Sequence, residues 1–507
     1  MQSRKKTGFD NEKYLAEQAK SILSRAEHVG SKLYLEFGGK LLFDYHAARV
    51  LPGYDPNVKI KLLQCLRERT DIILCIFSGD IERRKLRGDF GITYDADALK
   101  LMDDLKEWGL SVCAVVITRF SNQPSVRTFI NRLERRGIKV YTHRSIEGYP
   151  TAVDKIVSDQ GYGSNPFIET NKPVVVVTGP GPGSGKMATC LSQLYHEHKR
   201  GVSAGYAKFE TFPIWNLPLK HPINIAYEAA TADIGDFNQV DPFHLKAYGK
   251  TAVNYNRDIE IFSVVKHILR KITGAGSGYR SPTDMGVNRA GMAISNDEAV
   301  RNAAIQEVIR RYFRCHCEYV MGLCEQAAVD RVTLLLKELN VQPEARTVVE
   351  PARNAANDAE KLNLGNEGIC CGAAIELDKN TIVTGKNSPL LHAASSMVLN
   401  AIKQLAGVPD KLHLLAPNII DSINVLKGKI FGGKRLSLNL DETLIALSIS
   451  ATNNPAAQLA MEQLPNLRAC DAHLTHIPAP GDETGLKKLG INATSDPNFP
   501  SKALFIE

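Results

Sequence analysis

The sequence predicts an α/β protein whose N-terminal part is a Rossmann-like parallel sheet, and two observations predict it. Short apolar segments alternate with amphipathic segments from residue 57 to residue 177. This alternation is typical of parallel strands that helices cover on both faces. A glycine-rich, P-loop-like turn at 179–185 then joins an apolar strand to a helix, which is the arrangement that presents backbone N–H groups to an anion.

The elements of this part can be assigned in chain order. A helix is expected at 11–29, and Gly38-Gly39 between two alternating runs predicts a hairpin at 32–44. Three helix–strand pairs follow, with helices at about 57–69, 95–108 and 124–136 and strands at 72–77, 111–117 and 138–141. Ligands of such sheets bind at the carboxyl ends of the strands.

The glycine-rich turn is the strongest functional signal. Four valines (174–177) are followed by Thr178 and by Gly-Pro-Gly-Pro-Gly-Ser-Gly-Lys, which ends at Lys186. Glycines allow close approach of the backbone to a phosphate, and Lys186 adds a positive charge. We therefore expect ATP or another phosphorylated ligand, with Mg²⁺ as a candidate companion, at Gly181, Gly183, Ser184, Gly185, Lys186 and Thr189.

The turn departs from the usual P-loop in two positions. The residue five places before Gly185 is Pro180, where a P-loop has glycine, and Met187 replaces the Ser or Thr that binds Mg²⁺. Thr189 or Ser184 could supply a hydroxyl from a different position. The alternative interpretation is a glycine turn that packs closely and binds nothing.

A polar segment at 201–294 completes the first predicted domain, 1–295. Its density of Asp, Asn, His and Lys is more typical of a site lining than of a linker. We expect carboxylates that hold Mg²⁺ or act as a base, and cations that stabilise developing charge; the candidates are Asp233, Asp241, Asp284, Lys250 and Arg257. Each carboxylate taken alone is more often a cap or turn residue.

The pattern becomes helical from Asn296, which predicts a helical arm at 296–362, and a smaller α/β domain at 363–507. A strand, a turn at 378–380, a second strand and a helix at 390–405 resemble the core of cytidine deaminases. That family has His or Cys, Ala, Glu at the helix start, whereas this sequence has His392-Ala393-Ala394 and lacks Pro-Cys-x-x-Cys. The resemblance implies a deaminase-like fold without deaminase activity.

Four side chains in this last part could hold a metal ion by their residue types, namely His392, Cys470, His473 and His476. Histidines that are hydrogen-bonded at a strand end are the favoured interpretation, and we expect no zinc. Cys315 and Cys317 are also close in sequence, but residues two apart on a helix do not face each other, so we expect ordinary buried thiols.

Composition limits the classes of function. The 62 basic and 55 acidic residues give a net charge of +7 over 507 residues, too dilute to indicate nucleic-acid binding. No apolar run has transmembrane length and no signal peptide is visible, so no membrane partner is expected. The ten cysteines are scattered, which favours reduced thiols in the cytoplasm.

Runs along the whole chain resemble an uncharacterised bacterial family with chains of about this length. They include Leu35-Glu-Phe-Gly-Gly-Lys-Leu41, the turn through Met187 to Glu197, and Ser281-Pro-Thr-Asp-Met-Gly-Val-Asn288. The resemblance implies that Met187 belongs to the motif, which favours a phosphate site distinct from that of ordinary NTPases. Some members are labelled ATP-dependent zinc proteases, but this sequence contains no His-Glu-x-x-His.

Three hypotheses follow. The first is a phosphoryl- or group-transfer enzyme that binds a nucleotide or a phosphorylated small molecule at 179–186. The second is a non-catalytic metabolite-binding or regulatory protein, a homo-oligomer assembled through the helical arm. The third is a metal-dependent hydrolase that uses His392 and the neighbouring Cys and His residues.

Overall fold

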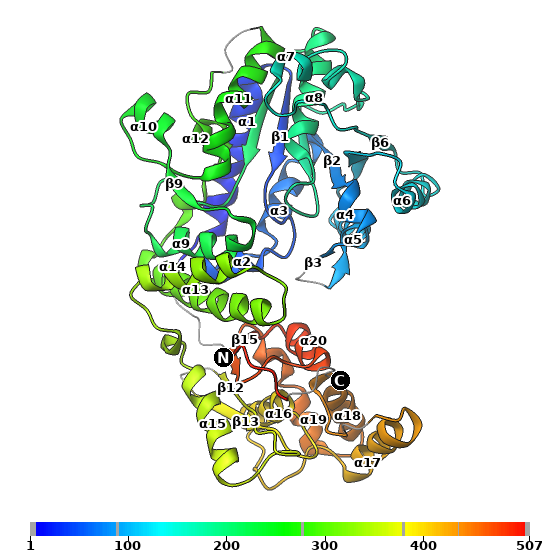
Figure 1. Ribbon diagram of the computed structural model, residues 1–507, viewed down its shortest axis with the longest axis vertical. Helices are drawn as coiled ribbons and strands as arrows, with labels where there is room; N and C mark the ends of the chain where they lie inside the picture. The colour runs from blue at the N-terminus through cyan, green and yellow to red at the C-terminus, as the bar shows by residue number, and fades with distance from the viewer. Residues whose placement is uncertain (1–6, 88–90, 275–277, 378–380, 434–435, 502–507) are drawn as a thin grey trace. The chain divides into compact units, whose positions relative to one another are not determined.

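The computed structural model describes residues 7–87, 91–274, 278–377, 381–433 and 436–501. The chain divides into two compact units (Figure 1). Of the described residues, the N-terminal unit comprises those within 7–231 and 236–304, and the C-terminal unit comprises 232–235 and those within 305–501. Each unit has its own sheet and its own hydrophobic core.

The N-terminal unit contains a seven-stranded sheet in the order β11-β8-β1-β7-β2-β5-β6. Every pairing in it is parallel, which confirms the Rossmann-like parallel sheet. Its strands are β1 (Lys32–Phe37), β2 (Thr70–Phe77), β5 (Val112–Thr118), β6 (Val140–Thr142), β7 (Val174–Thr178), β8 (Ala204–Phe209) and β11 (Gly286–Val287).

Helices cover both faces of this sheet (Figure 1). Alternate side chains of the central strands, such as Tyr34, Cys75 and Val175, pack against α8 (Lys186–Lys199) and α11 (Asn256–Thr273). Leu74 and Ile76 point to the opposite face, where α5 (Tyr94–Glu107) and α6 (Pro124–Glu134) pack. Burial on both faces explains why the strands are continuous apolar runs. α1 (Asn11–Val29) and α3 (Val58–Cys65) pack against each other, and α1 contacts β1.

The hairpin expected at 32–44 is wrong. Only 32–37 is a strand, and it lies in the sheet centre with parallel partners on both sides, Leu33 opposite Val174 and Leu35 opposite Ala207. The chain then turns at Gly39, where φ is +70°, and continues to α2 (Tyr45–Val50). The apparent alternation is misleading because residues 33–37 are all buried.

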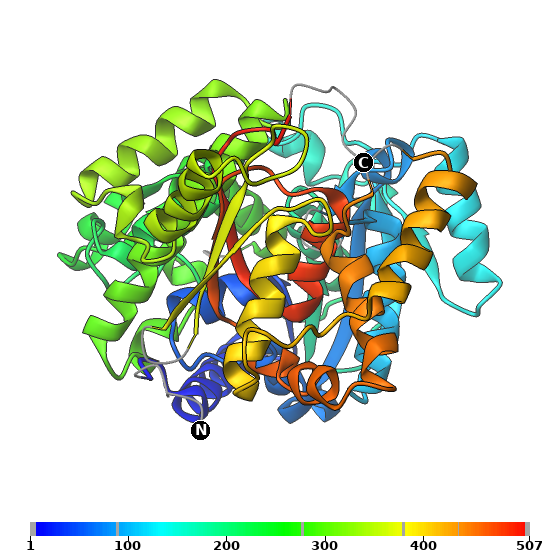
Figure 2. The ribbon, with the colours of Figure 1, turned by 90° about the horizontal axis from the view of Figure 1, so that it is seen from below.

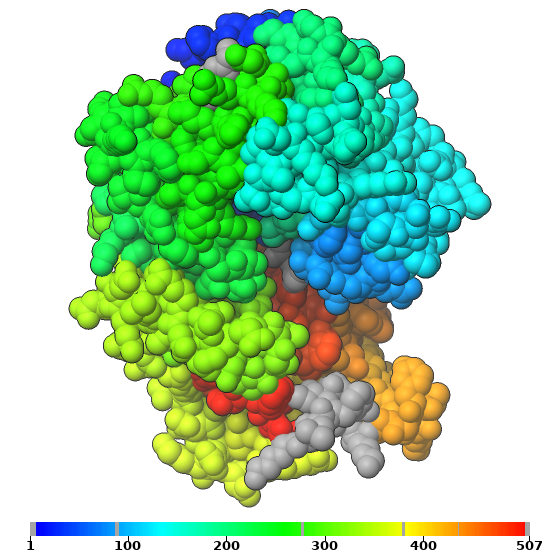
Figure 3. Space-filling view, turned by 45° about the horizontal axis from the view of Figure 1, so that its top comes forward, coloured from blue at the N-terminus to red at the C-terminus, as the bar shows by residue number. Residues whose placement is uncertain are grey.

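Shorter elements complete the N-terminal unit. The two edge strands of the sheet are β11 and β6. The part of the chain around α6 forms the cyan surface on the right of Figure 3. The remaining helices and strands are α4 (Ser78–Glu82), β3 (Leu86–Arg87), β4 (Ile92–Thr93), α7 (Val153–Ile156), α9 (Pro222–Ala230), β9 (Asn238–Val240), α10 (Pro242–Tyr248), β10 (Val253–Tyr255) and α12 (Pro282–Met285).

The helical region expected at 296–362 is α13 (Asp297–Val320), α14 (Gln326–Glu338) and α15 (Val349–Lys361). The two compact units divide at 304/305, inside α13, and α14 and α15 group with the C-terminal residues. α15 packs directly on β12, because its apolar side includes Val349 and Ala352, which are fully buried.

The C-terminal unit has a four-stranded sheet in the order β13-β12-β14-β15. The strands β12 (Gly372–Glu376) and β13 (Ile382–Lys386) are antiparallel, and α16 (Ala393–Ala406) runs alongside them, yellow in Figure 2. β14 (Asp471–Leu474) and β15 (Asn492–Ser495) are parallel. The other helices are α17 (Pro417–Val425), α18 (Leu440–Ala451), α19 (Pro455–Met461) and α20 (Pro480–Leu489).

The strand–strand–helix order expected for this part is confirmed, while the turn expected at 378–380 lies outside the described residues. Among the helices in the described ranges, none combines the length and the apolar character needed to cross a membrane.

Candidate functional site

The glycine-rich turn connects the carboxyl end of β7 to the first residue of α8. Gly183 and Gly185 have φ of +72° and +89°, a backbone conformation that side chains disfavour. The turn is fixed by its neighbours, since the Thr118 hydroxyl donates to the Ser184 carbonyl at 2.9 Å and Arg119 donates to the Gly183 carbonyl at 2.6 Å. β5 therefore holds the turn in place.

Close packing requires several of these glycines. A Cβ at Gly179 would lie 2.4 Å from the Cys75 carbonyl oxygen, and one at Gly185 would lie 2.7 Å from Thr118 Cγ2. A Cβ at Gly183 would meet no atom within 4 Å. A turn that only packs closely and binds nothing would therefore explain the glycines at 179 and 185. It does not explain why Gly183 faces open space.

Lys186 folds back over the turn that precedes it. Its Nζ donates to the Gly181 carbonyl at 3.2 Å and to Ser184 Oγ at 3.3 Å. Burial lowers the pKa of Lys186, and the Glu36 carboxylate opposes that effect. Within the described part of the chain, Lys186 forms no ion pair, so this half-buried cation has only neutral hydrogen-bond acceptors.

The backbone around Lys186 offers further donors. The first helical hydrogen bond from the turn region is Thr189 N–H to the Gly185 carbonyl at 3.0 Å. The N–H groups of residues 183 to 187 have no acceptor among the residues that the structure describes. A helix N-terminus with such free donors carries a partial positive charge that favours an anion.

Thr189, the sixth predicted loop residue, is buried in α8 rather than placed in the turn. Its hydroxyl lies 3.4 Å from the thiol of Cys75 on β2. The geometry therefore separates Thr189 from the five loop residues Gly181, Gly183, Ser184, Gly185 and Lys186, which lie together at the carboxyl edge of the sheet.

A buried charged network lies at the same edge, on the ends of β1 and β8. Lys208 pairs with Asp258 at 2.5 Å and with Glu210 at 2.9 Å, and the Tyr206 hydroxyl donates to Glu36 at 2.6 Å. Burial raises the pKa of Glu210, against the opposing effect of Lys208. The sequence interpretation missed this network, although charged residues inside the apolar runs 33–37 and 204–209 were a visible signal.

Two of the predicted catalytic carboxylates are helix caps. Asp241 begins α10, where its Oδ1 accepts from the N–H groups of Phe243 and His244 at 2.9 and 3.0 Å. Asp284 forms a capping box with Ser281 at α12. Their carboxylate oxygens are used in local hydrogen bonds, as expected of cap residues.

The other three predicted catalytic residues lie at the surface. Asp233 and Lys250 are exposed. Arg257 is also exposed and forms an ion pair with Asp236. Burial raises the pKa of Asp236. Asp233 groups with the C-terminal unit, whereas Asp241, Lys250, Arg257 and Asp284 belong to the N-terminal unit.

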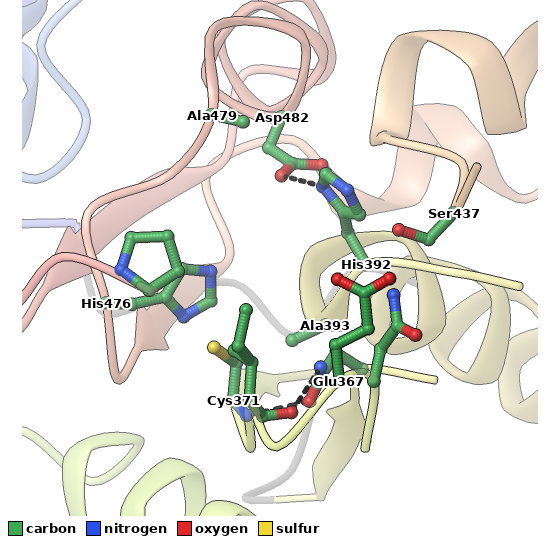
Figure 4. Close-up of a pocket in the computed structure, with 12 residues that line it drawn as sticks. Glu367, Cys371, His392, Ala393, Ser437, His476, Ala479 and Asp482 are labelled. Atoms are coloured by element: carbon green, nitrogen blue, oxygen red, sulfur yellow. Dashed lines mark hydrogen bonds and ion pairs between the residues drawn. The ribbon is translucent and has the colours of Figure 1, made fainter. Parts of the chain in front are cut away.

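The C-terminal unit contains a separate pocket that opens to solvent. Figure 4 shows His392 held by Asp482, with His476 and Cys371 on a different wall. The lining combines polar and apolar side chains; the twelve lining residues are Asn366, Glu367, Ile369, Cys371, Asn387, His392, Ala393, Ser437, His476, Ala479, Asp482 and Pro500.

The four residues considered for a metal ion are not brought into one cluster. His392 and His476 line the pocket, but His473 Nδ1 lies 2.8 Å from Thr494 Oγ1, and the Cys470 thiol lies 3.6 Å from the Asn466 carbonyl oxygen. In the described ranges, no group of three or more His, Cys, Asp or Glu side chains has the geometry to hold a metal ion.

These features define a two-unit α/β protein with a doubly wound parallel sheet, a glycine-rich strand-to-helix turn and a second pocket. The chain belongs to the family described as the domain of unknown function DUF1846, because residues 7–340 match its N-terminal model and residues 344–505 match its C-terminal model. The resemblance to an uncharacterised bacterial family is thereby confirmed.

Bacterial relatives match over nearly the entire chain. A UPF0371 protein of Clostridium botulinum (strain Alaska E43 / Type E3) is 57% identical over 500 residues, which cover 99% of each chain. A UPF0371 protein of Clostridium tetani is 56% identical over 500 residues, again 99% of each chain. The names of these relatives state no activity.

Proposed function

We propose that the 179–186 turn binds the phosphate groups of a nucleotide or a phosphorylated small molecule. The observation that carries the proposal is Lys186, a half-buried cation whose hydrogen bonds to described residues go to Gly181 O and Ser184 Oγ alone. A phosphate oxygen would replace these neutral acceptors with a negatively charged one, so that Lys186 would form an ion pair as well as a hydrogen bond.

The backbone supports the same ligand chemistry. N–H groups from 183 to 187 point away from protein acceptors, and α8 adds its dipole. Of the two departures from the P-loop pattern, Met187 removes a hydroxyl that could bind Mg²⁺ and Pro180 removes one backbone N–H, while the N–H groups of residues 183 to 187 remain. We infer a P-loop-like phosphate site that differs from that of the usual NTPases.

A Mg²⁺ ion bound with the ligand would need oxygen ligands from the protein or from phosphate. Glu36 fits this role best, since it lies opposite Val177 on the neighbouring strand, two residues before the turn begins at Gly179. Asp241 and Asp284 fit less well because backbone N–H groups already occupy their oxygens.

We infer that the C-terminal unit has a deaminase-like fold but lacks the residues for deaminase chemistry. A β12–β13 hairpin leads into α16, and His392 lies at the helix start. Ala394 occupies the position of the deaminase glutamate and is fully buried. The proposed function therefore rests on the N-terminal unit.

Thermal shift with three probes tests the phosphate proposal, because any ligand of the folded state raises its melting temperature. The probes are ATP, inorganic pyrophosphate and adenosine, with Lys186→Ala as the variant and Lys246→Ala, an exposed lysine on α10, as the control. We expect ATP or pyrophosphate to stabilise the wild type and Lys246→Ala but not Lys186→Ala. A shift with adenosine alone, or an equal shift in Lys186→Ala, would contradict the proposal.

A further inference from the structure

The pocket of the C-terminal unit contains a histidine whose orientation and tautomer are fixed. Asp482 is almost fully buried, and its Oδ1 accepts from the Leu440 N–H at 2.8 Å. Its Oδ2 lies 2.7 Å from His392 Nδ1. Because a carboxylate only accepts, Nδ1 of a neutral His392 carries the proton. Nε2 is then the proton acceptor.

A second histidine in the pocket has its ring nitrogens uncommitted. His476 is 6% exposed, and its buried Nδ1 has no hydrogen-bond partner among the described residues. Burial lowers the pKa of His476 to about 4, so the ring is neutral near pH 7. A buried polar nitrogen without a partner costs free energy unless a ligand supplies one.

The charge of the lining restricts what can bind. Glu367 and Asp482 are the charged carboxylates, and the twelve lining residues include no lysine or arginine. An anionic phosphate would therefore be repelled, whereas a neutral or cationic molecule would not. This pocket consequently requires ligand chemistry different from that of the glycine turn.

The thiol in the pocket is not poised to react. Burial raises the pKa of Cys371 to about 12, so the thiolate, which is the nucleophilic form, is rare at neutral pH. The Cys371 N–H donates to Asn387 at 2.7 Å, which fixes this wall of the pocket. The nucleophile that His392 can activate is thus a water molecule rather than this thiol.

We propose that the pocket is a second small-molecule site, in which His392, positioned by Asp482, acts as a general base in the hydrolysis of a neutral or cationic ester or amide. Water forms a bond from its oxygen to the carbonyl carbon while its proton passes to His392 Nε2. His476 donates a hydrogen bond to the carbonyl oxygen, which gains negative charge.

The second half of the reaction restores the site. The bond from the carbonyl carbon to the leaving oxygen or nitrogen breaks, and His392 returns its proton to that atom. The products are a carboxylic acid and an alcohol or amine. Asp482 is a positioning residue, because it contacts His392 and not the substrate.

Hydrolysis of p-nitrophenyl acetate, a neutral ester, tests the proposal in the full chain. His392→Gln should lower kcat/KM by about 100-fold or more, the usual contribution of a general base. His413→Gln, an exposed histidine of the same unit, should retain the wild-type value. Equal rates in His392→Gln and His413→Gln would overturn the proposal, as would a nitrophenolate burst that is lost in Cys371→Ser.

Asp482→Asn separates the positioning role from a merely structural one. Its carbonyl oxygen must still accept from Leu440 N–H, so its NH₂ group would face His392 and force the proton from Nδ1 to Nε2. We expect activity to fall as in His392→Gln, with a melting temperature still showing a folded chain. Nitrogen-15 shifts of labelled histidine should show the exchanged tautomer; an unchanged tautomer would overturn the role of Asp482.

Discussion

The glycine turn and the C-terminal pocket are opposite in polarity. The turn presents N–H donors and Lys186 with neutral acceptors, whereas the pocket presents carboxylates and imidazoles without a cation in its lining. An anion suits the first, and a neutral or cationic molecule suits the second. The comparison shows that each unit of one chain can have its own ligand chemistry.

The largest expected effect is a difference in unfolding free energy between two lysine variants. Lys208 holds a buried ion-pair network, whereas Lys186 is the lysine of the proposed anion site. Lys208 is buried between Asp258 and Glu210, so Lys208→Met leaves two buried carboxylates without a cation and should cost about 3–5 kcal/mol of unfolding free energy. Lys186→Met removes no ion pair and should cost less than about 1 kcal/mol.

Urea denaturation of the two lysine variants measures this difference. Equal losses of stability would contradict the distinction, because they would show that Lys186 also holds the fold together. In that case the turn would be structural, and the anion site would lose its main argument.

The next largest effect compares two glycine-to-alanine substitutions in the turn. One adds a steric clash to an unfavourable φ angle, and the other has the unfavourable φ angle alone. Gly185→Ala combines a φ of +89° with a clash against Thr118, and should cost about 2–4 kcal/mol. Gly183→Ala has a φ of +72° but open space around its Cβ, and should cost about 1 kcal/mol. Melting temperatures would measure both, and similar shifts would show that β5 does not fix the turn.

The smallest expected effect is the pH dependence that His476, in the C-terminal pocket, gives to the free energy of unfolding. Burial lowers the pKa of His476 from its ordinary value of 6.5 to about 4, so the unfolded chain binds more protons than the folded chain between these two pH values. The stability gained from the neutral ring is present above pH 6.5 and is lost as the pH falls toward 4.

Comparison of the wild type with His476→Gln tests whether protonation of His476 causes this loss of stability. Between pH 7 and pH 5 the wild type should lose about 1–2 kcal/mol more than the variant. Melting temperatures at the two pH values would show the difference. Parallel losses would mean that folding does not lower the pKa of His476 and would contradict the burial of its ring without a hydrogen-bond partner.

Local patterns predicted much of the fold, because the signals lie in single segments. Four valines, a glycine turn and an apolar helix sufficed for β7, the turn and α8. The hairpin prediction at 32–44 failed because, in the sequence, glycines that follow a central strand cannot be distinguished from glycines in a hairpin turn. Pairing partners far along the chain decide between these cases.

The sites depend on residues that are far apart in sequence, so they were predicted less well. His392 was found from its motif, but Asp482, which orients it, is 90 residues away. Lys208 and Asp258 are likewise 50 residues apart. Asp241 was chosen as a candidate because it is acidic, although Asp before Pro-Phe-His is a typical helix start.

Isothermal titration with ATP, with and without Mg²⁺, tests most directly whether the turn is an anion site independent of the pocket. The proteins are wild type, Lys186→Ala and His392→Gln. We expect wild type and His392→Gln to bind ATP alike and Lys186→Ala to lose binding while it stays folded. Retained binding in Lys186→Ala, or its loss in His392→Gln, would contradict the account.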